Sequence, residues 1–151
     1  MNPAAWVERH GHRRPDEPAL ADGERVHATW AEFAARTAQA AGGLRDEFGL
    51  RPGDRVAIVM RNRPEYLEAL FAIWHAGLVA VPVNARLHRD EIAYILDHSG
   101  STAVVTDDDH ADDVESLGAP LGSSRAAVVA RDERWERLTE ACQSVGRESW
   151  G

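Results

Sequence analysis

The chain has 151 residues, 44% of them hydrophobic and 28% charged, which is typical of a globular domain with a core. Its net charge of −8, with arginines spread along the chain, argues against a nucleic-acid partner, because phosphate binding needs clustered cations. The single cysteine, Cys142, cannot form an internal disulfide, which fits a reducing compartment. The N-terminus lacks the apolar core of a signal peptide, and the longest apolar tract, 69–83, is shorter than the ~20 residues of a spanning helix. We therefore expect a cytoplasmic protein without a membrane span.

The first thirty residues predict a short helix and a hairpin. Asn2-Pro3 can cap and begin a helix that carries Trp6 and ends near Gly11. Asp22-Gly23 separates two short apolar runs and favours the positive φ of a tight turn. A small β-hairpin is therefore predicted over 19–28.

A long helix follows the hairpin. Thr29 and Glu32 form a capping box, and apolar residues then keep helical spacing over 30–48 until Gly49 ends the helix. The Gly42-Gly43 pair inside this helix has no third glycine, no lysine and no preceding strand. It indicates close packing rather than a phosphate loop.

The middle of the chain predicts a strand, a helix and a second strand. The continuously apolar run 56–60 suits a strand that is buried on both faces of a parallel sheet. Asn62 can cap the next helix, over 63–76, in which Pro64 lies in the first turn. Gly77 can end that helix, and 79–83 forms the next buried strand. The predicted apolar stripe of the helix consists of Leu67, Leu70, Phe71 and Trp74.

The second half of the chain repeats this alternation. A helix is predicted over 89–99, closed by Gly100, and strands are predicted over 102–106 and 126–130. A last short helix is marked by Trp135, Leu138 and Ala141. The predicted fold is α/β: a mainly parallel sheet flanked by helices, with a small N-terminal β-hairpin, in one domain over 1–151.

Polar clusters offer weak candidates for a chemical site. The acidic cluster at 107–113 lacks the glycine and glutamate spacing of a calcium loop; an exposed loop before a helix is the better interpretation, and a divalent-cation site is the alternative. His10-Gly11-His12 is better explained as polar surface than as a metal site. Cys142 has no histidine or cationic cluster beside it, and Ser123 and Ser124 lack a nucleophile elbow. We therefore predict no catalytic, cofactor-binding or metal-binding residue.

The order of segments resembles the adenylate-forming acyl-CoA synthetases across roughly residues 5–106. The wording VPVNARL at 81–87 is more similar to acid:CoA ligases than to the amino-acid-activating domains of peptide synthetases. The segments that carry the resemblance are 29–33 (TWAEF), 51–58 (RPGDRVAI), 62–74, 75–84 (HAGLVAVPVN) and 91–96.

The resemblance implies an incomplete N-terminal AMP-binding domain. Complete enzymes of the family use ATP, Mg²⁺ and CoA: a carboxylate forms an acyl-adenylate, which CoA then converts to a thioester. Their lysines lie in a phosphate loop and in a C-terminal domain, whereas all 17 basic residues here are arginine. We expect the phosphate loop, the later motifs and the C-terminal domain to be absent, so that the chain alone is catalytically incomplete. Asn84 and Arg86 match a family signature, but we expect them to fix a turn.

Two hypotheses of function follow. The first is a fragment of a ligase for a carboxylic or fatty acid, whose partner is the remainder of the synthetase or a second copy of the chain. The alternative is a stand-alone α/β binding or interaction module without catalysis. A fragment leaves apolar surface uncovered, and the expected exposed residues are Leu67, Leu70, Phe71, Trp74, Trp135 and Trp150.

Overall fold

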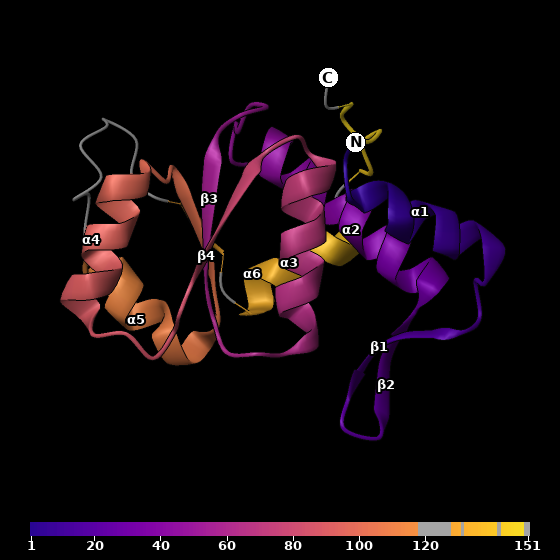
Figure 1. Cartoon of the computed structure of the whole chain (residues 1–151), viewed down its shortest axis with the longest axis horizontal. Coiled ribbons are helices and arrows are strands. Elements are labelled where there is room, and N and C mark those ends of the chain that lie inside the picture. Colours follow the sequence, from indigo (N-terminus) through magenta and orange to yellow (C-terminus); the bar gives the residue numbers. More distant parts are fainter. Residues whose placement is uncertain (118–127, 131, 142, 150–151) are drawn as a thin grey trace.

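The structure is a computed structural model, and it describes residues 1–117, 128–130, 132–141 and 143–149 (Figure 1). Four strands form a parallel sheet in the order β4-β3-β5-β6, and β1 and β2 form a separate antiparallel hairpin. In chain order the elements are α1 (Ala4–Arg13), β1 (Pro18–Asp22), β2 (Arg25–Thr29), α2 (Trp30–Asp46), β3 (Arg55–Val59), α3 (Pro64–His75), β4 (Val79–Val83), α4 (Arg89–Ser99), β5 (Ala103–Thr106), α5 (Asp108–Ser116), β6 (Val128–Ala130) and α6 (Asp132–Ala141).

The predicted α/β architecture is confirmed. β3 pairs in parallel with both β4 and β5, so that Val56 lies between Ala80 and Ala103. β6 pairs in parallel with β5, although residues 126–127 of the predicted strand lie outside the described residues. The hairpin and the helices after it also form where the sequence predicts them. None of the described helices is long and apolar enough to cross a membrane.

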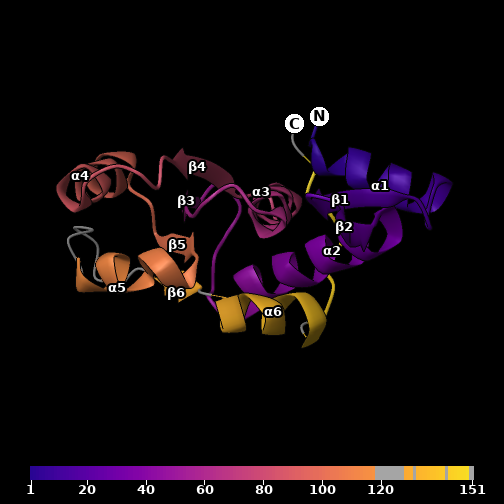
Figure 2. The ribbon, with the colours of Figure 1, turned by 90° about the horizontal axis from the view of Figure 1, so that it is seen from below.

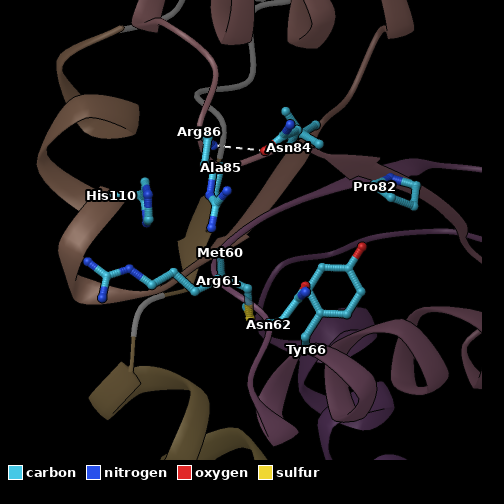
Figure 3. Close-up of a pocket in the computed structure, with 10 residues that line it drawn as sticks. Met60, Arg61, Asn62, Tyr66, Pro82, Asn84, Ala85, Arg86 and His110 are labelled. Atoms are coloured by element: carbon cyan, nitrogen blue, oxygen red, sulfur yellow. Dashed lines mark hydrogen bonds between the residues drawn. The ribbon is translucent and has the colours of Figure 1, made fainter.

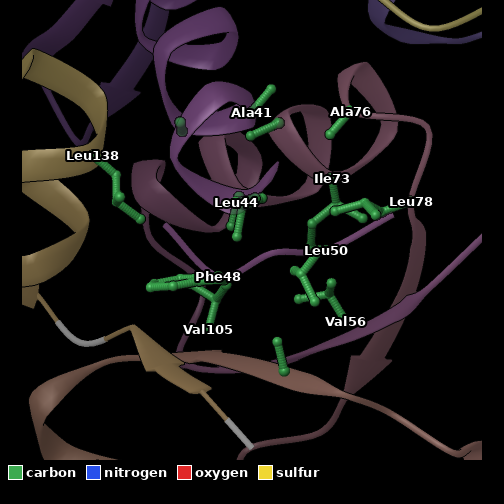
Figure 4. Packing of buried hydrophobic residues seen from close by; sticks show 14 of the residues in the cluster. Ala41, Leu44, Phe48, Leu50, Val56, Ile73, Ala76, Leu78, Val105 and Leu138 are labelled. Atoms are coloured by element: carbon green, nitrogen blue, oxygen red, sulfur yellow. The ribbon is translucent and has the colours of Figure 1, made fainter. Parts of the chain in front are cut away.

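Helices cover both faces of the sheet, with α4 and α5 on one face and α2, α3 and α6 on the other (Figures 1 and 2). Because side chains alternate along a strand, β3 sends Val56 and Ile58 into one core and Ala57 and Val59 into the other. The larger core also holds Leu44, Ile73, Leu78, Val105 and Leu138 (Figure 4).

The capping box at the start of α2 is confirmed. The Glu32 N–H donates to Oγ1 of Thr29, and the Thr29 N–H donates to Oε2 of Glu32 at 2.8 Å. A third, smaller core joins α1 and the hairpin to α2 through Val7, Leu20, Ala28 and Phe33.

The apolar stripe predicted for α3 is not the face of the helix that packs most deeply in the core. Leu67 is 40% exposed, and Leu70, Phe71 and Trp74 are only partly buried. The fully buried side chains are instead Glu68, Ala69, Ala72 and Ile73. Ala69, Ala72 and Ile73 have the same i, i+3, i+4 spacing, and the two alanines let the helix approach its neighbours closely. The helix therefore carries two apolar stripes, and the one rich in small residues packs in the core.

Three further expectations need correction. Asn62 does not cap α3: Arg63 is the cap residue, because the residue before Pro64 is restricted to extended conformations. β4 is not buried on both faces but forms one edge of the sheet, where Val79 is 45% exposed. Trp135 is not exposed: α6 packs along α2 and leaves it 2% accessible. Trp150 lies outside the described residues.

Candidate functional site

A pocket of about 880 Å³ lies at the carboxyl ends of β3 and β4 and beside the start of α5 (Figure 3). The chain crosses from β3 to β4 on one side and from β5 to β6 on the other, so strand order reverses between β3 and β5, the strands that Arg61 and His110 of the lining follow. Open α/β sheets bind ligands in such a crevice. The lining residues are Met60, Arg61, Asn62, Tyr66, Pro82, Val83, Asn84, Ala85, Arg86 and His110.

The turn after β4 forms one wall of the pocket. Oδ1 of Asn84 accepts a hydrogen bond from the Arg86 N–H at 3.0 Å, and the carbonyl of Asn84 accepts one from the Leu87 N–H at 3.1 Å. Asn84 therefore fixes the turn. The Arg86 side chain reaches into the pocket (Figure 3), where its guanidinium can meet a negatively charged ligand.

His110, near the start of α5, also lines the pocket and is paired with Asp107. Asp107 is buried and caps α5, accepting hydrogen bonds from the Arg61 N–H at 2.9 Å and from the His110 N–H at 3.1 Å. Its Oδ1 also contacts Nδ1 of the His110 ring. Burial raises the pKa of Asp107, but these hydrogen bonds outweigh it and hold the pKa below its usual value. An ionised Asp107 favours the tautomer with the proton on Nδ1, which leaves Nε2 of His110 as an acceptor.

Sequence reasoning missed this pair. The sequence analysis treats the acidic cluster at 107–113 as one unit and assigns no partner to His110. The signal was local, because Asp107 and His110 stand at the N-cap and third positions of α5, which begins inside the acidic cluster. The loop expected at 107–113 is wrong: α5 begins at Asp108, because Asp107 caps it, and the remaining acids of the cluster are exposed residues of this helix.

The described lining residues could bind one negatively charged group of a ligand, but they do not suit a triphosphate with its metal ion. A triphosphate site needs a glycine-rich cradle of backbone N–H groups and several cations. No glycine lines this pocket, and Arg61 is already paired with Asp109 at 2.9 Å. In the described part of the chain, no three histidine, cysteine or acidic residues come together as metal ligands.

Other candidates from the sequence lie away from the pocket. Nδ1 of His10 lies 3.0 Å from the guanidinium of Arg14, and the His10 ring packs on Trp30. His27 pairs with buried Glu68 across 41 residues of sequence. Cys142 lies outside the described residues.

Comparison with known proteins assigns the chain to a family. The model of the AMP-binding enzyme family matches residues 7–149. Feruloyl-CoA synthase of an Amycolatopsis species is 41% identical over 115 residues, which cover 76% of this chain and 23% of that enzyme. A benzoate CoA ligase from Burkholderia xenovorans LB400 shares the fold, with a TM-score of 0.85 at 24% identity over 100% of this chain and 31% of that one.

The N-terminal domain of FACL13 from Mycobacterium tuberculosis also shares the fold, with a TM-score of 0.83 at 22% identity; the match covers 99% of this chain and 38% of that domain. The chain thus spans about a quarter of the length of the feruloyl-CoA synthase that it matches. The matched part is the N-terminal region of acyl-CoA synthetases. The chain belongs to the AMP-binding enzyme family.

Proposed function

We propose that the chain serves as the N-terminal portion of an ATP-dependent acid:CoA ligase and does not activate an acid by itself. The observation that carries this proposal is the pocket at the carboxyl ends of β3 and β4, whose described lining includes Arg61 and Arg86 but no glycine-rich phosphate cradle. The family match over 7–149 and the 23% coverage of feruloyl-CoA synthase support it. Residues outside this chain would then supply the cradle, the lysines and the magnesium ligands.

In the assembled ligase, the pocket would form one wall of a ligand site. Arg86 would meet a negatively charged group, while Asn62, Tyr66 and Asn84 offer hydrogen-bonding side chains around it. In the complete enzyme, bound ATP, Mg²⁺ and CoA would supply the chemistry of acid activation. The substrate would be a carboxylic or fatty acid, and the single cysteine suits a cytoplasmic enzyme.

Acid-dependent exchange between ATP and pyrophosphate tests the proposal. The purified chain should give no exchange above a no-protein blank with any fatty or aryl acid, while a complete acid:CoA ligase serves as positive control. A chimera in which this chain replaces the matching region of feruloyl-CoA synthase should recover exchange, and that enzyme without its N-terminal region should not. Exchange by the isolated chain would contradict the proposal, as would equal activity of the truncated enzyme and the chimera.

A stand-alone binding module is the second candidate, and the packing of residues 143–149 favours it. This segment contacts α1, α2 and α3 and packs beside Gly42 and Gly77. The last described residues therefore pack back onto the first helices of the chain. A module of this kind would give a monodisperse monomer with a sharp cooperative thermal transition and no binding of an apolar dye. The same chain would also fail to restore exchange in the chimera.

A further inference from the structure

Helices α4 and α5, which lie together on one face of the sheet, belong to the most acidic stretch of the chain (Figures 1 and 2). Residues 89–116 contain nine carboxylates and one arginine, Arg89, so their net charge is −8 with neutral histidines. The whole chain has the same net charge, so acidic and basic residues are equal in number outside this stretch. Such a concentration of like charge attracts cationic partners and repels anionic ones.

A pocket of about 370 Å³ lies on α4 and the turn before it. Leu87 and Ile95 are partly buried and pack against the core beneath α4, so they supply apolar contact to the pocket. Asp90, Glu91 and Tyr94 complete the described lining. Apolar, aromatic and carboxylate groups therefore meet at one place on the acidic surface.

Tyr94 presents an aromatic ring to solvent at this pocket, and the residue is 67% exposed. The ring stacks on His98, with 5.4 Å between the ring centroids and 10° between the ring planes. His98 does not line the pocket, so this contact holds the ring without filling the pocket. The other face of the ring has no aromatic or cationic partner among the described residues. An open ring face of this kind attracts a cation.

The two carboxylates of the pocket differ in their contacts. Oε2 of Glu91 accepts from the His88 N–H at 2.9 Å and belongs to the cap of α4. The Asp90 side chain is 88% exposed, and its Oδ2 lies 3.6 Å from Nδ1 of His88. Because that nitrogen accepts from the Asp90 N–H, it carries no proton for the carboxylate. Asp90 is therefore the carboxylate that stays open to a ligand.

We propose that this pocket binds the lysine or arginine side chain of a basic segment on a partner protein. The aliphatic stem packs on Leu87 and Ile95, while the cationic head meets the Asp90 carboxylate and the open face of Tyr94. The surrounding carboxylates steer a basic partner toward the pocket. A second copy of the chain brings a net charge of −8 and fits this surface less well. This inference does not depend on the ligase function.

NMR titration of the isotope-labelled full chain with a lysine peptide tests the proposal. The probe is a synthetic peptide of alternating lysine and glycine residues, and the same peptide with acetylated lysines is the control for charge. We expect the largest amide shifts at residues 87–95, and the affinity should fall as salt is raised. The acetylated peptide should give no shifts there. A lysine peptide that leaves residues 87–95 unshifted overturns the proposal.

Variants of exposed residues separate the pocket from the general negative field. Tyr94→Ser and Asp90→Asn should each weaken binding about two- to fivefold, as expected for an exposed cation–π contact or ion pair. Tyr94→Phe keeps the ring and should bind like the unmodified chain. Asp113→Asn removes one charge from the exposed side of α5, outside the pocket, and should weaken binding by less than about 1.5-fold.

Three results of these titrations would overturn the proposal. Equal weakening by Asp90→Asn and Asp113→Asn would mean that the general field, rather than the pocket, binds the peptide. Unchanged affinity in Tyr94→Ser would exclude the aromatic ring from binding. Amides at 87–95 that shift when the chain alone is diluted would assign the pocket to a second copy instead of a basic partner.

Discussion

The guanidinium of Arg36 in α2 donates to both carboxylate oxygens of Glu68 in α3, at 2.6 and 3.1 Å. Glu68 is completely buried and also accepts from the indole N–H of Trp135 in α6 at 3.1 Å. Burial opposes the charge of Arg36, but its hydrogen bonds to Glu68 and Glu136 outweigh it and raise its pKa. One buried charge pair thus ties three helices together on one face of the sheet.

Replacing Glu68 by Gln should destabilise the fold by about 3 kcal/mol, because Arg36 would lose its buried partner. Oε2 of Glu68 accepts hydrogen bonds from Arg36 and Trp135. Oε1 of Glu68 is in contact with Nε of Arg36 and with His27. The NH₂ group of an amide at this position would therefore face a donor in either orientation. Urea unfolding monitored by circular dichroism measures the loss.

The matched control is Glu133→Gln on α6, where the carboxylate is 88% exposed and 3.9 Å from Arg137. It should change the unfolding free energy by less than about 0.5 kcal/mol. Equal effects of the two substitutions would show that the buried pair of Arg36 and Glu68 contributes no more to stability than an exposed pair does.

Local sequence signals predicted most of the fold. The Thr29 and Glu32 capping box, the apolar run of β3 and the left-handed Gly77 and Gly100 each depend on neighbours within a few residues. The pairing of strands then follows from helical crossovers, which favour parallel neighbours. These features needed no knowledge of distant contacts.

The prediction failed where distant residues decide the outcome. The sequence analysis assigns no role to Glu68, because its partners Arg36, His27 and Trp135 are 32, 41 and 67 residues away. The two apolar stripes of α3 could not be told apart by spacing, since both repeat at i, i+3 and i+4. The pocket was harder to predict, because residues that follow three different strands line it, and only the order of strands in the sheet brings them together.

Gly42→Ala should destabilise the chain by about 1–2 kcal/mol even though alanine favours helices. Helix propensity would stabilise α2 by about 1 kcal/mol. The new methyl group, however, would lie 1.9 Å from the backbone oxygen of Gln143, which no rotamer change can relieve. Overpacking of this kind costs about 1–3 kcal/mol, and displaced Val145 would lose its core contacts as well.

Gly146→Ala is the matched control within residues 143–149, the segment that packs on α2. No atom lies within 4 Å of its added methyl group, so the free energy of unfolding should stay unchanged or rise by up to about 1 kcal/mol. Thermal unfolding of both variants measures the difference. A stabilised Gly42→Ala protein would mean that residues 143–149 do not pack against α2 in solution.

Asp107→Ala should lower stability by about 1–2 kcal/mol at pH 7, because α5 loses its cap. The pKa of Asp107 is lowered in the folded protein, so its stabilising effect is complete above the ordinary carboxyl value of about 3.9 and disappears as pH falls through the lower folded value. The difference between the two proteins should therefore be constant from pH 7 to pH 5 and shrink below about pH 4.

Urea midpoints at pH 7, 5 and 3 give this dependence, with Asp113→Asn on the exposed side of α5 as control. The control should track the unmodified chain at every pH. A stability difference for Asp107→Ala that grows toward pH 3 would contradict the depressed pKa.

The isolated chain should self-associate at micromolar concentration through the open edge of its sheet. β4 is an edge strand with unpaired backbone groups, and Val79 on it is 45% exposed. Such an edge can pair with another strand, and a lysine placed on it prevents this pairing. Sedimentation velocity should therefore show concentration-dependent association that Val79→Lys reduces strongly. Tyr94→Lys, which changes an exposed aromatic residue on α4, supplies the same charge away from the edge and should leave most of the association intact. Equal effects of the two lysines would point to net charge rather than the edge, and a monodisperse unmodified chain would favour the stand-alone module over a ligase segment.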